Sequence, residues 1–258
     1  MRLTIVGCSG SFAGPESPAS CYLVTAEADG RTWRIVLDLG NGALGGLQRH
    51  AELEDLDAVL VSHLHPDHCI DLTGLYVTRK YRPEGPLPQR LPVYGPAGSA
   101  ERLAAAYEGI DEAGMSRELD FRRLLDGVPV HLGPFRVVPH RVNHPVEAFG
   151  FRVECDGRVL SYSGDTDSCP ALGPLLTGAD LALVDSAFVD GRDDIRDIHM
   201  SGSRAAQVAV EAGGVRRLML THIPPWNDPQ VCREQAASVW RGEGREVELA
   251  EPGATYEV

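Results

Sequence analysis

The chain has 258 residues, of which 43% are hydrophobic and 24% charged, proportions typical of a folded globular protein rather than a disordered one. Its 37 acidic and 24 basic residues give a formal net charge of −13, which disfavours tight binding to nucleic acids and other polyanions. No apolar run approaches the ~18 residues that span a bilayer, and the first run is too short for a secretory signal, so one cytoplasmic domain over residues 1–258 is expected, with no membrane partner.

Short β-rich runs recur along the chain. They are rich in Val, Ile, Leu and aromatic residues and stop at Gly, Pro, Asp or Ser, as strands commonly do. The strands predicted in this way are Arg2–Val6, Tyr22–Ala26, Trp33–Leu37, Ala58–Val61, Phe135–Val138, Phe149–Val153, Val159–Tyr162, Leu181–Val184 and Leu218–Leu220.

Helices are predicted where apolar periodicity adjoins a Gly or Pro boundary. These stretches are Leu44–His50, Cys69–Tyr81, Ala97–Ala106, Ser203–Ala212 and Gln230–Arg241. The charged, weakly periodic segment 108–126 is expected to be a surface excursion. Because a set of strands in the first half is followed by a comparable set in the second, the pattern suits two sheets packed face to face with helices outside.

A dense cluster of possible metal ligands follows the fourth predicted strand. His63 and His65 alternate on an extended segment, so both point to the same side. Asp67 and His68 then fall on the turn into the next helix, where Pro66 restricts the backbone. Imidazole nitrogens and carboxylate oxygens are the ligands preferred by zinc and related divalent ions, so this HxHxDH pattern predicts a metal site.

Three later residues occupy the same kind of position, directly after an apolar run. They are His144, Asp165 and His222. Taken singly, each has a structural interpretation, as a capping Asp or as a His bonded to the backbone. Together with the HxHxDH cluster they provide ligands for two metal ions bridged by one carboxylate.

This order of residues resembles the metallo-β-lactamase superfamily, from the opening Gly7-Cys8-Ser9-Gly10-Ser11 to the closing Thr221-His222-Ile223-Pro224. The resemblance implies an α+β fold, a four-layer αββα sandwich with two divalent metal ions at one edge of the sheets. Zinc suits the mixed ligands, and manganese or iron are alternatives. By the same resemblance, Asp38 supports the ligand loop, although a turn-forming Asp before Gly explains it equally well. The resemblance assigns the first metal to His63, His65 and His144, the second to Asp67, His68 and His222, and the bridge to Asp165.

One further residue points to a branch of this superfamily. His199, followed by Met200-Ser201, resembles the histidine that assists the leaving group in tRNase Z-like phosphodiesterases; its alternative is a flank of the following helix. tRNase Z itself fits less well, because residues 145–164 leave no room for its substrate arm. The stretch 185–197 also carries five aspartates against two arginines, which predicts a negative rim that repels a polyanion.

The sequence is also similar to actinobacterial cyclic-nucleotide phosphodiesterases of this fold, in Gly14-Pro15-Glu16-Ser17-Pro18-Ala19-Ser20, Leu47-Gln48-Arg49-His50 and Pro225-Trp226. That similarity implies hydrolysis of a small anionic substrate such as cyclic AMP by a metal-bound hydroxide. Asp67 would orient the nucleophile or accept its proton, and His199 would act as the general acid. Trp226 either stacks on a purine or is buried at the sandwich edge, and Gly7–Ser11 either offers N–H groups to a phosphate or forms a tight turn.

Other activities remain open on the sequence alone. A metal-dependent hydrolase of a lactone, a thioester or another phosphate or sulfate ester has the same ligands, as does a tRNase Z-like nuclease. A metal-loaded sensor that does not turn over its ligand is least favoured, because a binding module needs no positioned proton donor. A homodimer is compatible with the sequence.

Overall fold

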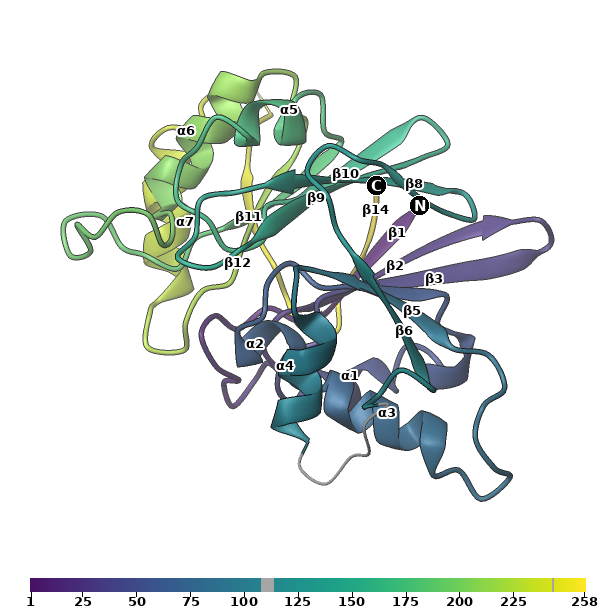
Figure 1. Ribbon diagram of the computed structural model, residues 1–258. Helices are drawn as coiled ribbons and strands as arrows, with labels where there is room; N and C mark the ends of the chain where they lie inside the picture. Colours follow the sequence, from purple (N-terminus) through teal and green to yellow (C-terminus); the bar gives the residue numbers. More distant parts are fainter. Residues whose placement is uncertain (108–113, 243) are drawn as a thin grey trace.

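Two seven-stranded mixed sheets pack face to face in the computed structural model, which describes residues 1–107, 114–242 and 244–258 (Figure 1). The first sheet consists, in spatial order, of β14 (Thr255–Glu257), β1 (Arg2–Gly7), β2 (Cys21–Ala28), β3 (Arg31–Leu37), β4 (Ala58–Leu60), β5 (Leu91–Gly95) and β6 (Leu119–Arg123). The second consists of β13 (Val247–Leu249), β12 (Leu218–Thr221), β11 (Leu181–Asp185), β10 (Arg158–Tyr162), β9 (Phe149–Cys155), β8 (Phe135–Arg141) and β7 (Val130–Leu132).

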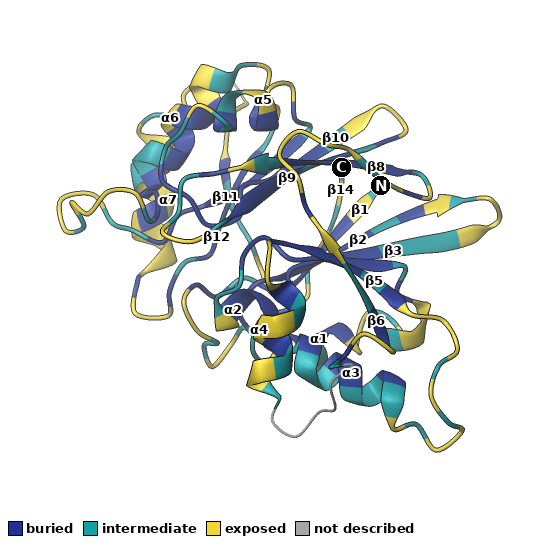
Figure 2. Cartoon of the chain, in the orientation of Figure 1, coloured by how far each residue is buried: buried dark blue, intermediate teal, exposed yellow. Residues whose placement is uncertain are grey.

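Helices cover the outer face of each sheet, and Figure 2 shows that their sheet-facing sides are buried and their outer sides exposed. Over the first sheet lie α1 (Ala43–Leu47), the 3₁₀ helix η1 (Leu53–Asp55), α2 (Pro66–Cys69), α3 (Leu72–Lys80) and α4 (Ser99–Ala106). Over the second lie α5 (Leu172–Leu176), α6 (Gly202–Ala212) and α7 (Pro229–Ala237). Among the described residues, no helix is long and apolar enough to cross a membrane.

The apolar residues form three layers that match this architecture. The central layer lies between the sheets and includes Tyr22 from β2 and Phe151 and Tyr162 from the second sheet, all fully buried. The two outer layers join each sheet to its helices. Since each sheet buries both faces, the predicted αββα sandwich is confirmed.

Each sheet is antiparallel on one side and parallel on the other. Strands β1 to β3 pair antiparallel and β3 to β6 pair parallel, while β7 to β10 pair antiparallel and β10 to β13 pair parallel. Ligand sites of open sheets with parallel strands usually form beyond the carboxyl ends of those strands. A ligand site is therefore expected among the residues that follow β3, β4, β10, β11 and β12.

All nine predicted strands are present, but five others were not predicted. Strands β7, β13 and β14 have only three residues each, too few to show an alternating pattern. The predicted helix Cys69–Tyr81 corresponds to α3 (Leu72–Lys80), and its first residue, Cys69, instead ends the separate helix α2. The expectation of a surface excursion over 108–126 is wrong for its second part, where β6 forms the edge of the first sheet with Leu119 buried; residues 108–113 lie outside the described chain.

Candidate metal centre

Every side chain predicted to bind a metal lies just beyond the carboxyl end of a strand, and the structure brings all of them together. Two groups contain predicted ligands only, and a third joins Asp165 and His222 to Asp185 and His199; in each group the ligand atoms lie within 4.8 Å of one another. The first group is His63, His65 and His144, and the second is Asp67, His68, Asp165 and His222.

The first group is a set of three imidazoles whose ring nitrogens converge. His65 Nδ1 lies 2.9 Å from His63 Nε2 and 3.3 Å from His144 Nε2. Burial lowers the pKa of all three rings, and that of His63 falls well below its ordinary value. His144 Nδ1 donates to the Ile198 carbonyl at 2.9 Å, which leaves Nε2 with its lone pair towards the group. Three neutral imidazoles arranged in this way suit a divalent cation.

The second group is organised around the carboxylate of Asp165, which is almost fully buried. Its Oδ2 lies 3.2 Å from His68 Nε2 and 3.4 Å from His222 Nε2, and 3.6 Å from His63 Nε2 in the first group. Its Oδ1 is buried and has no hydrogen-bond partner within the described structure. A buried carboxylate that faces both groups and keeps one oxygen unsatisfied fits a bridging ligand between two cations.

Electrostatics in the second group favour positive charge. Burial lowers the pKa of His222, but the Asp165 carboxylate and the contacts to Asp185 and Asp67 outweigh it and raise the pKa to about 10. Burial raises the pKa of Asp67, yet its contacts with His222 and His68 hold it well below the usual range. The carboxylates therefore stay ionised. A metal cation bound among them would balance their negative charge, as a proton on His222 does without metal.

Asp38 holds the His68 ring from behind the ligand group. Its buried carboxylate accepts the Ser62 amide at 2.6 Å, and it accepts the Tyr162 hydroxyl and His68 Nδ1 at 2.8 Å each. Because Nδ1 is occupied in this way, His68 Nε2 is the atom left to face Asp165. Asp38 also has a left-handed backbone (φ 59°), as its position at the turn after β3 requires.

We expect Asp38→Asn to weaken metal binding about 10- to 100-fold, because an amide nitrogen in place of Oδ2 cannot accept the hydrogen bonds of His68 Nδ1 and the Tyr162 hydroxyl and orients the His68 ring less firmly. Metal affinity is measured by competition with a chromogenic chelator. Asp57→Asn is the control. Asp57 accepts a hydrogen bond from the Arg34 amide at 2.7 Å and belongs to neither ligand group. Equal affinities for the two variants would contradict the supporting role of Asp38.

His199 lies between the two groups, in the loop that precedes α6. Its ring centroid is 5.4 Å from that of His144 and 5.2 Å from that of His222. Its Nδ1 is 2.9 Å from Asp185 Oδ2, and the ring packs edge-on against Phe188. Burial lowers the pKa of His199, but Asp185 more than compensates and raises it. His199 stands two residues before Ser201, the N-cap of α6, so it flanks the helix as well as facing the ligand groups.

Asp185 is a site residue that the sequence reasoning placed wrongly, on an acidic rim. It ends β11, is fully buried, and lies 3.6 Å from His222 Nδ1 as well as against His199. Its Oδ2 also accepts the Thr166 amide at 3.1 Å. The signal that identifies it is the one that identified Asp165, a carboxylate at the end of an apolar strand.

Part of the rest of the expected acidic rim is held by hydrogen bonds and ion pairs. Asp193 forms an ion pair with Arg192 at 2.6 Å, and Asp190 accepts the Ser201 hydroxyl. Nearby, the buried Asp167 binds two arginines, Arg196 at 2.9 Å and Arg204 at 2.7 Å. These pairs place the nearby arginines against Asp193 and Asp167, but they do not change the surplus of negative charge that the composition of residues 185–197 gives.

The Gly-rich opening motif packs directly on the metal-ligand backbone. A Cβ at Gly10 would lie 2.1 Å from the His222 carbonyl oxygen, so only glycine fits there. The next amide, of Ser11, lies 3.3 Å from His222 Nε2. Ser11 and His222 both have positive φ (64° and 57°), a strained conformation for residues other than glycine that is concentrated at functional sites.

Comparisons with known proteins agree with this geometry. Residues 33–223 match the family described as beta-lactamase superfamily domain. A Mycobacterium tuberculosis protein is 44% identical over 94% of this chain and 88% of its own length, and ribonuclease Z of Mycobacterium bovis is 30% identical over 87% and 86%. The probable metallo-hydrolase YhfI of Bacillus subtilis is 27% identical over the full length of both chains; its crystal structure superposes with a TM-score of 0.84 at 26% identity over 99% of both.

Proposed function

This chain is a hydrolase of the metallo-β-lactamase superfamily, and we propose that it is a phosphodiesterase that uses two divalent metal ions to hydrolyse cyclic nucleotides such as cyclic AMP. The observation that carries the proposal is the placement of His199, whose Nδ1 is occupied by Asp185, beside two groups of ligands that share Asp165. His63, His65 and His144 would hold one ion, Asp67, His68 and His222 the other, with Asp165 between them. The ions supply an activated water and offset the negative charge of the phosphoryl group.

His199 and Asp67 then have distinct tasks. Because Asp185 occupies His199 Nδ1, the proton available to a substrate is the one on Nε2, which is donated to the departing ribose oxygen. The Asp67 carboxylate, kept ionised by His222 and His68, would orient the attacking water or accept its proton. Asp185 positions His199 and offsets the charge of its protonated ring, as a carboxylate behind a catalytic histidine does.

The test is a comparison of kcat/KM across substrates, with protein of measured metal content. Cyclic AMP should give the largest value, ahead of linear phosphodiesters, a lactone and a thioester. A larger value for a lactone or thioester would overturn the proposal in favour of another hydrolase. Calorimetric binding of cyclic AMP to the metal-loaded protein without product would instead identify a sensor.

Nuclease activity is the second candidate, favoured by the 30% identity to ribonuclease Z. The structure gives it little support beyond the shared fold, because most of residues 145–164 form the β9–β10 hairpin and leave no inserted arm. With a net charge of −13, we expect tRNA and duplex DNA to bind more weakly than about 1 µM even at low salt. Tighter tRNA binding with a steep salt dependence, measured by filter retention, would restore the nuclease interpretation.

A further inference from the structure

Two exposed aromatic side chains from distant parts of the chain meet beside the second ligand group. Phe12 follows β1 and Trp226 follows β12, and their ring centroids are 5.0 Å apart with planes tilted by 40°. The two residues are 40% and 63% exposed, so Trp226 is not buried at the sandwich edge. Exposed aromatic surface that gathers in one place, rather than singly, commonly marks a binding site.

Both rings are fixed close to the metal ligands by the loops that carry them. Phe12 directly follows Ser11, whose amide lies 3.3 Å from His222 Nε2, and its own carbonyl accepts the Ser9 hydroxyl at 2.7 Å. Trp226 lies four residues after His222. Its neighbour Asn227 donates to the Ala187 carbonyl at 2.8 Å, which anchors the second loop to the end of β11.

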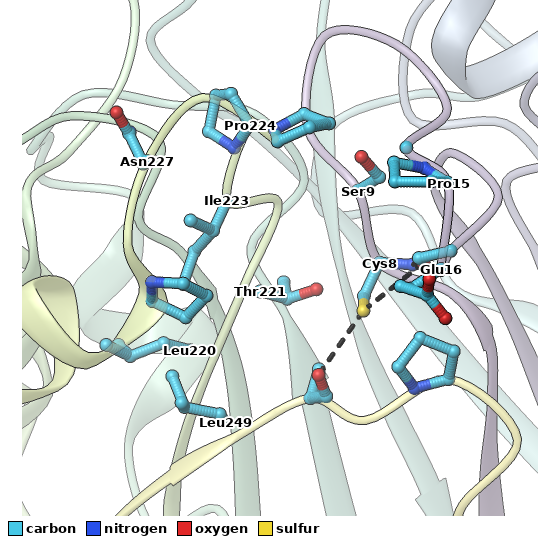
Figure 3. Close-up of a pocket in the computed structure, with 16 residues that line it drawn as sticks. Cys8, Ser9, Pro15, Glu16, Leu220, Thr221, Ile223, Pro224, Asn227 and Leu249 are labelled. Carbon is cyan, nitrogen blue, oxygen red and sulfur yellow. Dashed lines mark hydrogen bonds between the residues drawn. The ribbon is translucent and has the colours of Figure 1, made fainter.

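The two loops are stiff as well as anchored. Figure 3 shows them facing each other across a cavity of about 320 Å³, with Pro15 on one side and Pro224 on the other. The Gly10 amide donates across to the Ile223 carbonyl at 3.2 Å and ties the loops together. Proline restricts the backbone of both segments, which limits how far the loops that carry the two rings can move.

We propose that Phe12 and Trp226 form the subsite for the heterocyclic base of a nucleotide substrate, and that this pair selects nucleotides over phosphodiesters without a base; this rests on the proposed function. A base is planar and uncharged, so it stacks on an aromatic ring without needing a cation, in a chain whose net charge is −13. A base–aromatic stack is worth about 5- to 150-fold in binding. Because every base has a π-face, the pair should accept adenine and guanine alike.

The experiment compares cyclic AMP with its base-free analogue, methyl riboside 3′,5′-cyclic phosphate, which has the same leaving oxygen. In Phe12→Ala and Trp226→Ala, the ratio of their kcat/KM values should fall about 5- to 150-fold, mainly through a higher KM for cyclic AMP. Trp226→Phe should restore most of the ratio. Tyr81→Ala removes another exposed aromatic ring, at the end of α3, and should leave the ratio unchanged.

A second measurement separates this inference from the proposed function. Of the three tryptophans, Trp226 alone is exposed, so quenching of tryptophan fluorescence by AMP, but not by ribose 5-phosphate, should report stacking and be lost in Trp226→Phe. Hydrolysis of cyclic AMP with an unchanged ratio in both Ala variants would overturn the base subsite and leave the function standing. Quenching by AMP in a protein that hydrolyses no cyclic nucleotide would support the base subsite and overturn the proposed function. Dissociation of a dimer in Trp226→Ala, with the ratio unchanged, would show that the pair contacts a second copy of the chain.

Discussion

Asp165→Ala is expected to remove metal from both ligand groups and to lower phosphodiester hydrolysis by about 10³-fold or more, because metal ions contribute several kcal/mol to stabilising the transition state. One carboxylate oxygen lies 3.2 Å to 3.6 Å from His68, His222 and His63, so its loss affects both groups at once. Metal content is measured by mass spectrometry of protein purified without chelator. The parent protein should carry close to two ions per chain.

The matched control is Asp180→Asn, at the opposite end of β11. Asp180 accepts the Val159 amide at 2.9 Å and pairs with Arg158, but it contacts no ligand residue. This variant should keep both its metal and its activity. If Asp165→Ala did the same, the bridging assignment would be wrong; if it lost only one ion, Asp165 would be a terminal ligand of that ion alone.

The sequence was most informative where a local pattern coincides with a strand end. His63, His65, Asp67 and His68 stand together in the chain, and the three distant ligands each follow an apolar run, so their meeting at one sheet edge could be predicted. Strands β5 and β6 could not, since β5 includes Pro92 and β6 exposes Arg122 and Arg123. Their pairing depends on the neighbouring strand more than on their own sequence.

The count of charged residues in a segment predicted the roles of single side chains less reliably than the strand-end pattern did. Asp185 and Asp193 count equally in a composition, yet one is buried against His199 and the other is paired with Arg192 on the surface. Position relative to a strand separates these roles where composition does not, because Asp185 ends β11 and Asp193 lies in the loop that follows. Similarly, nothing local in the sequence links Phe12 to Trp226, which are 214 residues apart and meet because their loops are hydrogen-bonded between Gly10 and Ile223.

His199→Ala is expected to lower kcat for cyclic AMP by about 10²- to 10⁴-fold while leaving metal content and melting temperature near those of the parent. The ring is held by Asp185 and Phe188 and is assigned to neither ion in the proposal, so its loss is expected to remove a proton donor without removing a ligand. His131→Ala, on β7, is the control and should have no effect on kcat.

The leaving group decides whether His199 donates a proton or only supports the fold. Cyclic AMP must expel a ribose alkoxide, which is strongly basic and needs protonation as the bond to phosphorus breaks. Bis(p-nitrophenyl) phosphate expels a stabilised phenolate that needs little protonation. Its rate of hydrolysis should therefore fall much less in His199→Ala than that of cyclic AMP. A histidine with a structural role would lower the melting temperature and slow both substrates alike. Equal losses on the two substrates, at unchanged metal content, would therefore exclude the proton-donor role.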